Sequence, residues 1–223
     1  MGVFAGPEIV ESGLVLALDA GNTKSYPGTG TTWTDLSGNG RNATLFNSPT
    51  FDSNNGGSFI FDGVDNWARA TDNGIGTGST LPHSIEMWVN FNVLTSTRWW
   101  LAVLGQFGTG AHHWIGTSPT ATQFGAWSAN CQRSPNLIGT NNWLHITSSY
   151  DGTNLILYVN NTATASCVAD GFNFTNSDFT IGLKIGAENY FNGKVSIARL
   201  YNRALTAQEI TQNFNATRSR FGI

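Results

Sequence analysis

Residues 85–93 read IEMWVNFNV, and this stretch decides the fold class. Every second residue in it is apolar: Ile85, Met87, Val89, Phe91 and Val93. Successive side chains of a strand point to opposite faces, so a period of two predicts a half-buried antiparallel strand. Trp88 is the aromatic residue on the polar face. We expect either that an N-terminal segment or a helix covers Trp88, or that it belongs to a contact surface.

Segments with similar alternation of apolar residues occur along the whole chain. We expect strands at residues 14–19, 58–64, 98–106, 112–117, 123–129, 143–150, 155–160, 179–185 and 194–201. Turn-forming residues separate them, and the sequence Asp151-Gly152-Thr153-Asn154 predicts a hairpin. Many short strands without helices between them are typical of a sandwich or barrel. The sequence therefore predicts an all-β, antiparallel β-sandwich.

A single short helix is expected near the end of the chain. Thr206-Ala207-Gln208-Glu209 has the pattern of a capping box, and Ile210 and Phe214 follow at helical spacing. We expect one domain over residues 13–223, preceded by an N-terminal arm at residues 1–12. The arm holds apolar residues, so we expect it either to fold back over its own sandwich or to dock onto a neighbouring subunit.

Composition excludes several classes of protein. Only 11% of the 223 residues are charged and the net charge is −3, which disfavours nucleic-acid binding. The longest clear apolar run, residues 14–18, is too short to cross a membrane. The first residues lack the pattern of a secretory signal. Cys131 and Cys167 lie near predicted strand ends, and one disulfide or two free thiols are both open.

Several motifs, taken in order, resemble a known family. They are WTDLSGNGRN at 33–42, FIFDGVD at 59–65, WLH at 143–145, YDG at 150–152 and YFNG at 190–193. The chain resembles laminin-G-like, concanavalin A-like lectin/glucanase domains from about residue 13 to residue 217. The resemblance implies a concanavalin A-like jelly roll. The residues of these motifs are most similar to those of domains carried on tailed-phage virion proteins. This resemblance implies assembly in a host cell and release by lysis.

Catalytic residues were sought first among the acidic residues. The resemblance implies that a glucanase would carry two or three carboxylates on alternate residues of one strand. No two acidic residues in this chain are two positions apart. We therefore expect no enzyme activity. The doublet His112-His113 places its rings on opposite faces of a strand, and we expect one packed and one exposed imidazole.

Calcium is the one cofactor that the resemblance implies. Related domains bind it at loop ends through Asp and Asn oxygens, the hard ligands that Ca²⁺ prefers. Asp62, Asp65 and Asn66 are the candidate ligands here. The alternative is that these residues only form Asx turns at the end of a strand.

Aromatic residues are the candidate ligand-binding group. Sugar sites place Trp and Tyr faces against the apolar side of a sugar ring. The candidates lie on successive central strands: Trp99, Trp100, His112, Trp114 and Trp127. Packing within the protein is the alternative role for this group.

These features lead to one functional expectation and two alternatives. We expect a non-enzymatic virion surface or structural module, with virion proteins or further copies of itself as partners and host surface glycans as candidate ligands. The first alternative is a free-standing carbohydrate-binding lectin. The second is a glycoside hydrolase. Neither nucleic acid nor a membrane is an expected partner.

Overall fold

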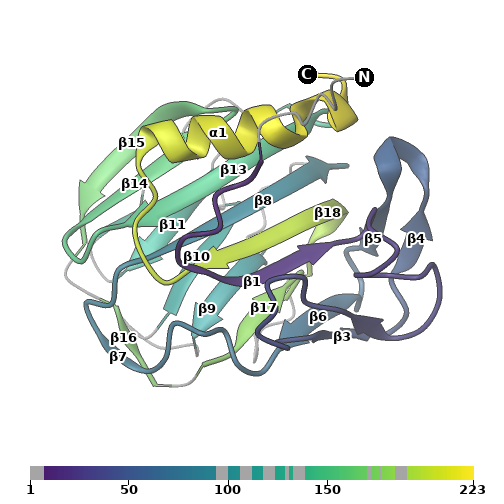
Figure 1. The fold of residues 1–223 in the computed structure, drawn as a ribbon, viewed down its shortest axis with the longest axis horizontal. Helices are drawn as coiled ribbons and strands as arrows, with labels where there is room; N and C mark the ends of the chain where they lie inside the picture. The colour runs from purple at the N-terminus through teal and green to yellow at the C-terminus, as the bar shows by residue number, and fades with distance from the viewer. Residues whose placement is uncertain are drawn as a thin grey trace, which may run out of the picture.

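The computed structural model describes residues 8–93, 100–105, 112–117, 124–128, 131–132, 139–169, 172–175, 177–183 and 190–223. Of residues 117, 124–128 and 131–132 only the backbone is described. Two antiparallel sheets lie one in front of the other, and a helix runs across one of them (Figure 1). This arrangement confirms the predicted antiparallel sandwich.

The helix-side sheet has the strand order β15-β14-β13-β8-β18-β5-β4, and β1 pairs with β18. Its strands are β1 (Leu14–Asp19), β4 (Thr50–Asp52), β5 (Ser58–Asp62), β8 (His83–Phe91), β13 (Trp143–Tyr150), β14 (Asn154–Val159), β15 (Thr162–Val168) and β18 (Asn192–Tyr201). β13 and β14 form the predicted hairpin.

The opposite sheet has the order β12-β11-β10-β9-β17-β6-β3-β2. Its strands are β2 (Thr32–Trp33), β3 (Ala43–Phe46), β6 (Trp67–Ala70), β9 (Trp100–Gly105), β10 (His112–Thr117), β11 (Phe124–Ser128), β12 (Cys131–Gln132) and β17 (Phe179–Ile181). A small third sheet pairs β7 (Gly78–Ser79) with β16 (Asn173–Phe174). The helices are η1 (Asn54–Gly56), α1 (Ala207–Thr217) and η2 (Arg218–Phe221).

β8 is the central strand of the helix-side sheet, and all of its residues are buried. Its apolar positions, such as Met87 and Phe91, belong to the main core between the sheets. Its polar face lies under the C-terminal helices instead of facing solvent. Trp88 is 0% exposed and stacks on Phe221 with ring centroids 4.1 Å apart. The predicted cover of Trp88 is confirmed, and helices from the C-terminal end provide it.

α1 begins where the sequence places it. The Thr206 Oγ1 atom accepts a hydrogen bond from the Glu209 backbone N–H, and a Glu209 carboxylate oxygen accepts from the Thr206 backbone N–H. Together they satisfy two amides that the first turn would leave unpaired. The buried residues of α1 are Ile210, Asn213 and Phe214.

Residues 8–12 form a strap that lies against α1 and β18. The Val10 backbone N–H donates to Asn213 Oδ1 at 2.7 Å, and the Val10 carbonyl accepts from the Tyr201 hydroxyl at 3.1 Å. The Gln212 side chain donates to the Glu8 carbonyl at 2.8 Å. These contacts favour the fold-back alternative for this part of the arm, whereas residues 1–7 lie outside the described residues.

Cys167 on β15 is disulfide-bonded, and the sequence holds one other cysteine, Cys131. This favours the bridged alternative over two free thiols. Within the described ranges, no helix combines the length and the apolar character needed to cross a lipid bilayer.

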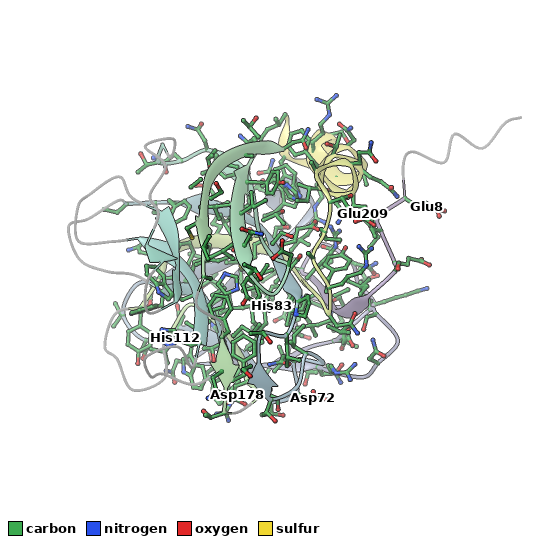
Figure 2. All side chains as sticks on the ribbon, turned by 90° about the vertical axis from the view of Figure 1, so that its left-hand side faces the viewer. Glu8, Asp72, His83, His112, Asp178 and Glu209 are labelled. Carbon is green, nitrogen blue, oxygen red and sulfur yellow. The ribbon has the colours of Figure 1, made fainter. Side chains whose placement is uncertain are left out.

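A chain of polar groups crosses the apolar core between the two sheets. His83 of β8 contacts His113 of β10 at 2.7 Å, and His113 contacts Ser148 of β13 at 2.8 Å. The Leu81 carbonyl can only accept, so His83 donates to it through Nδ1 and accepts from His113 through Nε2. His113 Nε2 then accepts from the Ser148 hydroxyl. Figure 2 shows His83 between the two layers.

This chain of hydrogen bonds requires both imidazoles to be neutral. Burial lowers the pKa of His83 from 6.5 to about 4, and burial together with the neighbouring histidines lowers the pKa of His113 well below 6.5. Unfolded histidines bind a proton below about pH 6.5, whereas these folded ones do not. The stability that they confer is therefore present above pH 6.5 and is lost as the pH falls toward 4.

We predict that the free energy of unfolding falls between pH 7 and pH 5, by about 2 kcal/mol from His83 and further from His113. Urea unfolding at both pH values measures the change. Glu86, whose folded pKa is about 2, adds its own loss only below pH 4.5. The triple variant H83F/H113F/S148A is the control and should show a flatter profile. Equal stability of the wild type at pH 7 and pH 5 would contradict the prediction.

We also predict that deleting residues 2–12 lowers the melting temperature by several degrees. The deletion leaves Asn213 and Tyr201 without their strap partners, and an unpaired buried polar group costs about 1–3 kcal/mol. Calorimetry on the deletion measures the shift, with a deletion of residues 2–7 as the control that keeps the strap. An unchanged melt without residues 2–12 would rule out a stabilising strap.

Candidate functional site

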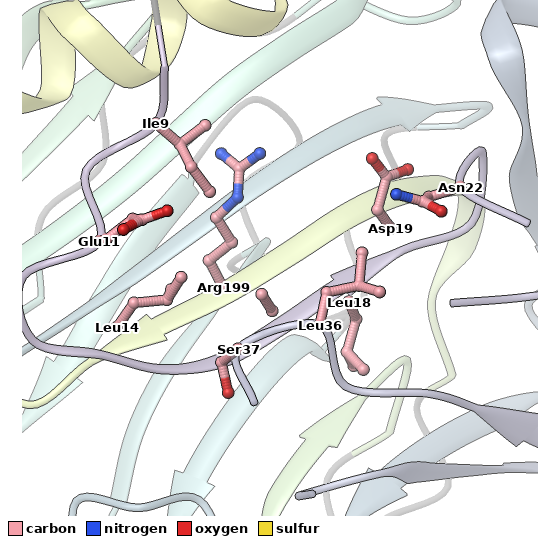
Figure 3. A pocket seen from close by; sticks show the side chains of 10 residues that line it. Ile9, Glu11, Leu14, Leu18, Asp19, Asn22, Leu36, Ser37 and Arg199 are labelled. Carbon is pink, nitrogen blue, oxygen red and sulfur yellow. The ribbon is translucent and has the colours of Figure 1, made fainter. Parts of the chain in front are cut away.

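A cleft of about 520 Å³ opens on the outer face of the helix-side sheet, between the strap, β1 and β18. Figure 3 shows Arg199 rising from β18 toward Ile9, with Asp19 and Asn22 together on the far side. Residues from four separate segments line it: Ile9, Glu11, Leu14, Ala17, Leu18, Asp19, Asn22, Leu36, Ser37 and Arg199.

Asp35 holds one wall of the cleft in place. The residue is 8% exposed, and its Oδ1 atom accepts from the backbone N–H groups of Ala17 and Ser37, each at 2.9 Å. Its Oδ2 atom accepts from the Ser37 hydroxyl at 2.8 Å and from the Arg41 N–H at 3.0 Å. The carboxylate thereby fixes the turn that places Leu36 at the cleft, and it explains the Asp in the motif at residues 33–42.

The loop after β1 holds the second wall. Asp19 accepts from Arg220 at 2.7 Å, and the same carboxylate oxygen accepts from the Gly21 N–H at 2.9 Å. A Cβ atom on Gly21 would lie 2.0 Å from the Gly56 carbonyl oxygen, so only glycine permits this close approach. The loop therefore packs tightly on Arg220 and presents Asp19 and Asn22 to the cleft.

Arg199 forms part of the floor, and a buried network holds it. The residue is 5% exposed and donates through Nη1 to Glu86. Glu86 also receives hydrogen bonds from His145 and Asn213. Burial alone would raise the pKa of Glu86, but the charge of Arg199 and the bonds from His145 and Asn213 lower it to about 2. The carboxylate therefore stays ionised and fixes the guanidinium.

The charges around the cleft are largely compensated. Arg199 is balanced by Glu86, and Asp19 is balanced by Arg220. Glu11 forms no ion pair among the described residues. Leu36, which is 36% exposed, adds an apolar surface. Polar acceptors, one donor in the floor and the apolar side chains of Leu14 and Leu36 suit an uncharged ligand that carries many hydroxyl groups.

Sequence reasoning missed this cleft, because its residues share no local pattern. Ser37 appeared only as part of a quoted motif. Arg199 lies on the last long strand, and the residue types next to it do not mark it as a site residue. The one available signal was a charged residue within the apolar second half of the strand, residues 197–201.

The predicted aromatic group lies on the opposite sheet. Trp100 and Trp114 pack edge to face with centroids 4.7 Å apart, and Trp100 lies 6.2 Å from the His112 ring. Figure 2 shows His112 toward the side away from the helix. Trp99 lies outside the described residues, and of Trp127 only the backbone is described. The structure therefore brings three of the five together.

These three side chains are closely packed. Trp100, Trp114 and His112 are 2%, 3% and 5% exposed. The expectation that one ring of the His112-His113 doublet is exposed is wrong, because His112 packs beside Trp100 while His113 faces the core. A ligand-binding role for the aromatic group stays a prediction, since in this conformation the described rings are covered.

The candidate calcium ligands bond to the backbone of their own loop. Asp62 Oδ1 accepts from the N–H groups of Val64 at 2.8 Å and Asp65 at 3.4 Å. Asn66 Oδ1 accepts from the Asp62 N–H, and its amide donates to the Asn47 carbonyl at 2.7 Å. This is the Asx-turn arrangement.

Two of the candidate oxygens, Asp62 Oδ1 and Asn66 Oδ1, are engaged by backbone amides. In the described part of the chain, no three His, Cys, Asp or Glu side chains gather as metal ligands. The carbonyl oxygen of Asn66 is already turned toward a backbone amide. Calcium binding by Asp62, Asp65 and Asn66 thus stays a prediction without a preformed site.

Comparison with known families agrees with the fold. Residues 62–211, more than half of the chain, match the model of the concanavalin A-like lectin/glucanase superfamily. The chain belongs to this superfamily. A search of curated proteins finds no match.

Several solved structures share the fold of this chain. Domain 4 of AbnA, a GH43 extracellular arabinanase from Geobacillus stearothermophilus in complex with arabinotriose, has a TM-score of 0.70 and 19% identity, covering 92% of this chain and 100% of that one. Trypanosoma rangeli sialidase has a TM-score of 0.67 and 18% identity over 92% of this chain and 33% of its own. The binding domain of Paraclostridial Mosquitocidal Protein 1 has a TM-score of 0.65 and 18% identity over 92% and 52%.

At these identities the likeness shows the fold alone. The chain spans all of the arabinanase domain but only about a third of the sialidase. None of these three proteins is described as a virion component, so the expected virion role stays a prediction.

We predict that melts in millimolar calcium and in a chelator coincide, because Asp62 Oδ1 and Asn66 Oδ1 already accept backbone hydrogen bonds. Binding to the folded state alone would raise the melting temperature by mass action. A calcium-dependent rise that the D65N variant loses would contradict the prediction and would show that the loop rearranges around the ion.

Proposed function

We propose that this chain is a non-catalytic saccharide-binding domain, and that the cleft beside Arg199 holds the sugar. The observation that supports the proposal is the cleft itself. Its arginine and its aspartate are each paired with an opposite charge, and leucine side chains give it an apolar surface. Its volume of about 520 Å³ lies within the usual range for small-ligand sites, about 300–1,000 Å³.

The chemistry of the cleft suits a neutral sugar. Carboxylate and amide oxygens of Glu11, Asp19 and Asn22 accept hydrogen bonds from hydroxyl groups, while Arg199 donates. Leu14 and Leu36 offer an apolar surface to the C–H groups of a sugar ring. Because Arg199 is already neutralised by Glu86, it does not demand an anionic ligand.

The comparison with the arabinanase domain adds support. That domain has the fold of this chain over its full length, and it was solved with arabinotriose. A small sandwich of this size is therefore sufficient to hold an oligosaccharide. The disulfide at Cys167 also suits a protein that works outside a reducing cytosol.

The carboxylates near the cleft are arranged for binding and not for turnover. Glycoside hydrolysis needs one carboxyl group that is protonated at working pH. Glu86 has a pKa of about 2 and lies beneath α1, so it supplies no proton. Asp19 is engaged by Arg220 and Gly21.

We predict that arabinotriose or another neutral oligosaccharide from a glycan array binds and that E11A weakens binding about fivefold, the value of one hydrogen bond. Isothermal titration measures the affinity. E8A is the matched control, because Glu8 lies on the same strap but does not line the cleft. The L36A variant removes part of the apolar surface and should also weaken binding in the same titration.

Two results would contradict the proposal. One is an array on which no saccharide binds. The other is a bound saccharide whose affinity is unchanged in both E11A and L36A. Release of shorter sugars from the bound saccharide would contradict the non-catalytic part.

A further inference from the structure

A row of side chains crosses the outer face of the opposite sheet, on the side of the molecule away from the cleft. Strand pairing aligns Thr44 with Arg69, Arg69 with Thr180, Thr180 with Val103, and Val103 with Trp114. The neighbours of Thr180 on β17, Phe179 and Ile181, belong to the main core. Thr180 and its partners in the row therefore face outward.

Arg69 lies in this row between Thr44 and Thr180, and no carboxylate of the described residues pairs with it. Among the described residues, its contacts are with two rings, Phe46 at 5.7 Å and Trp67 at 5.6 Å. These rings stack on one another with centroids 3.9 Å apart. Five other cations form ion pairs: Arg41, Lys194, Arg199, Arg203 and Arg220.

Two polar atoms beside one another in this row are buried and unsatisfied. Arg69 Nε and Thr180 Oγ1 have no hydrogen-bond partner, and Thr180 is 1% exposed. Within the described ranges, no other pair of such atoms belongs to residues directly opposite in register. A buried donor without an acceptor is costly, so two adjacent ones call for an explanation.

We propose that Arg69 and Thr180 form a binding site for an oxyanion, the carboxylate of an acidic saccharide. The Arg69 Nε–H group can only donate, the Thr180 hydroxyl can donate as well as accept, and the guanidinium supplies positive charge, so a negatively charged acceptor satisfies both groups. Arg69 is partly exposed, so the anion meets it from solvent. Because Arg69 Nε and the Thr180 hydroxyl are both buried in the free protein, the proposal requires the Arg69 side chain to turn when the anion binds.

The stacked pair of rings explains why the ligand is a saccharide and not a bare ion. Phe46 and Trp67 are both half-buried and stand next to the guanidinium. An aromatic surface beside a cation matches a sugar ring that carries a carboxylate. This site differs from the cleft, where every cation is already paired, and the two proposals stand or fall separately.

Titration with sodium glucuronate at constant ionic strength tests the proposal, with the Arg69 Nε–H and Trp67 Nε1–H signals followed by NMR. We expect both signals to shift and to saturate. Sodium sulfate should shift the Arg69 signal alone, and glucose should shift neither. R69Q should weaken glucuronate binding about tenfold. R218Q is the matched control, since Arg218 also lies over a ring, that of Phe214.

If R69Q fails to fold, the variant T180V provides a second test of the anion site. Removal of a buried unsatisfied hydroxyl should raise the melting temperature while it weakens glucuronate binding. If the Thr180 hydroxyl had only a structural role, T180V would lower the melting temperature and leave glucuronate binding unchanged. The proposal is overturned if the shifts do not saturate, if sulfate reproduces the shift of Trp67, or if R69Q and R218Q bind glucuronate equally.

Discussion

Glu86 carries a full charge at a place that water does not reach, and the helix-side half of the molecule is organised around it. Its side chain is 0% exposed and contacts Arg199 of β18, His145 of β13 and Asn213 of α1. A buried charge is tolerated only when it is paired and hydrogen-bonded, and removing one partner costs about 3–5 kcal/mol. The carboxylate thus ties three strands to the helix. Asn213 extends the tie to the strap through Val10, so one wall and the floor of the cleft depend on the same ion.

The strands that could be predicted from the sequence are those in which large apolar residues alternate with polar ones. β8 and the β13–β14 hairpin agree with the prediction because large apolar side chains mark their inward faces. β6 was missed because alanines, Ala68 and Ala70, form its inward face and give little contrast. β15 was missed because none of its residues is buried, and its small side chains show no apolar face. Burial of the two alanines holds β6 in its sheet, whereas β15 is a strand because its backbone pairs with β14.

The candidate site was harder to predict for a different reason. Residue type indicated the aromatic group correctly as a cluster, because Trp100, His112 and Trp114 lie on neighbouring strands. It could not indicate exposure, since cover depends on segments distant in sequence. The cleft combines residue 9 with residue 199, and it appears only when the pairing of β1 with β18 is known. The motif around Asp35 was recognised as a family signature, but its physical role, to clamp a turn onto β1, required the hydrogen bonds.

Because few residues of this chain are charged, each charged side chain and its partner can be considered individually. The sequence has only 11 Lys and Arg against 14 Asp and Glu, and among the described residues Arg41, Lys194, Arg199, Arg203 and Arg220 form ion pairs. In the cleft this pairing removes net attraction for ions and leaves directional hydrogen bonds, which is what discrimination among hydroxyl groups needs. Arg69 departs from that rule: it lies among rings and beside an unsatisfied hydroxyl. A charge kept unpaired while its neighbours are compensated costs stability in the free protein, and an anionic ligand that restores the missing acceptor would recover it.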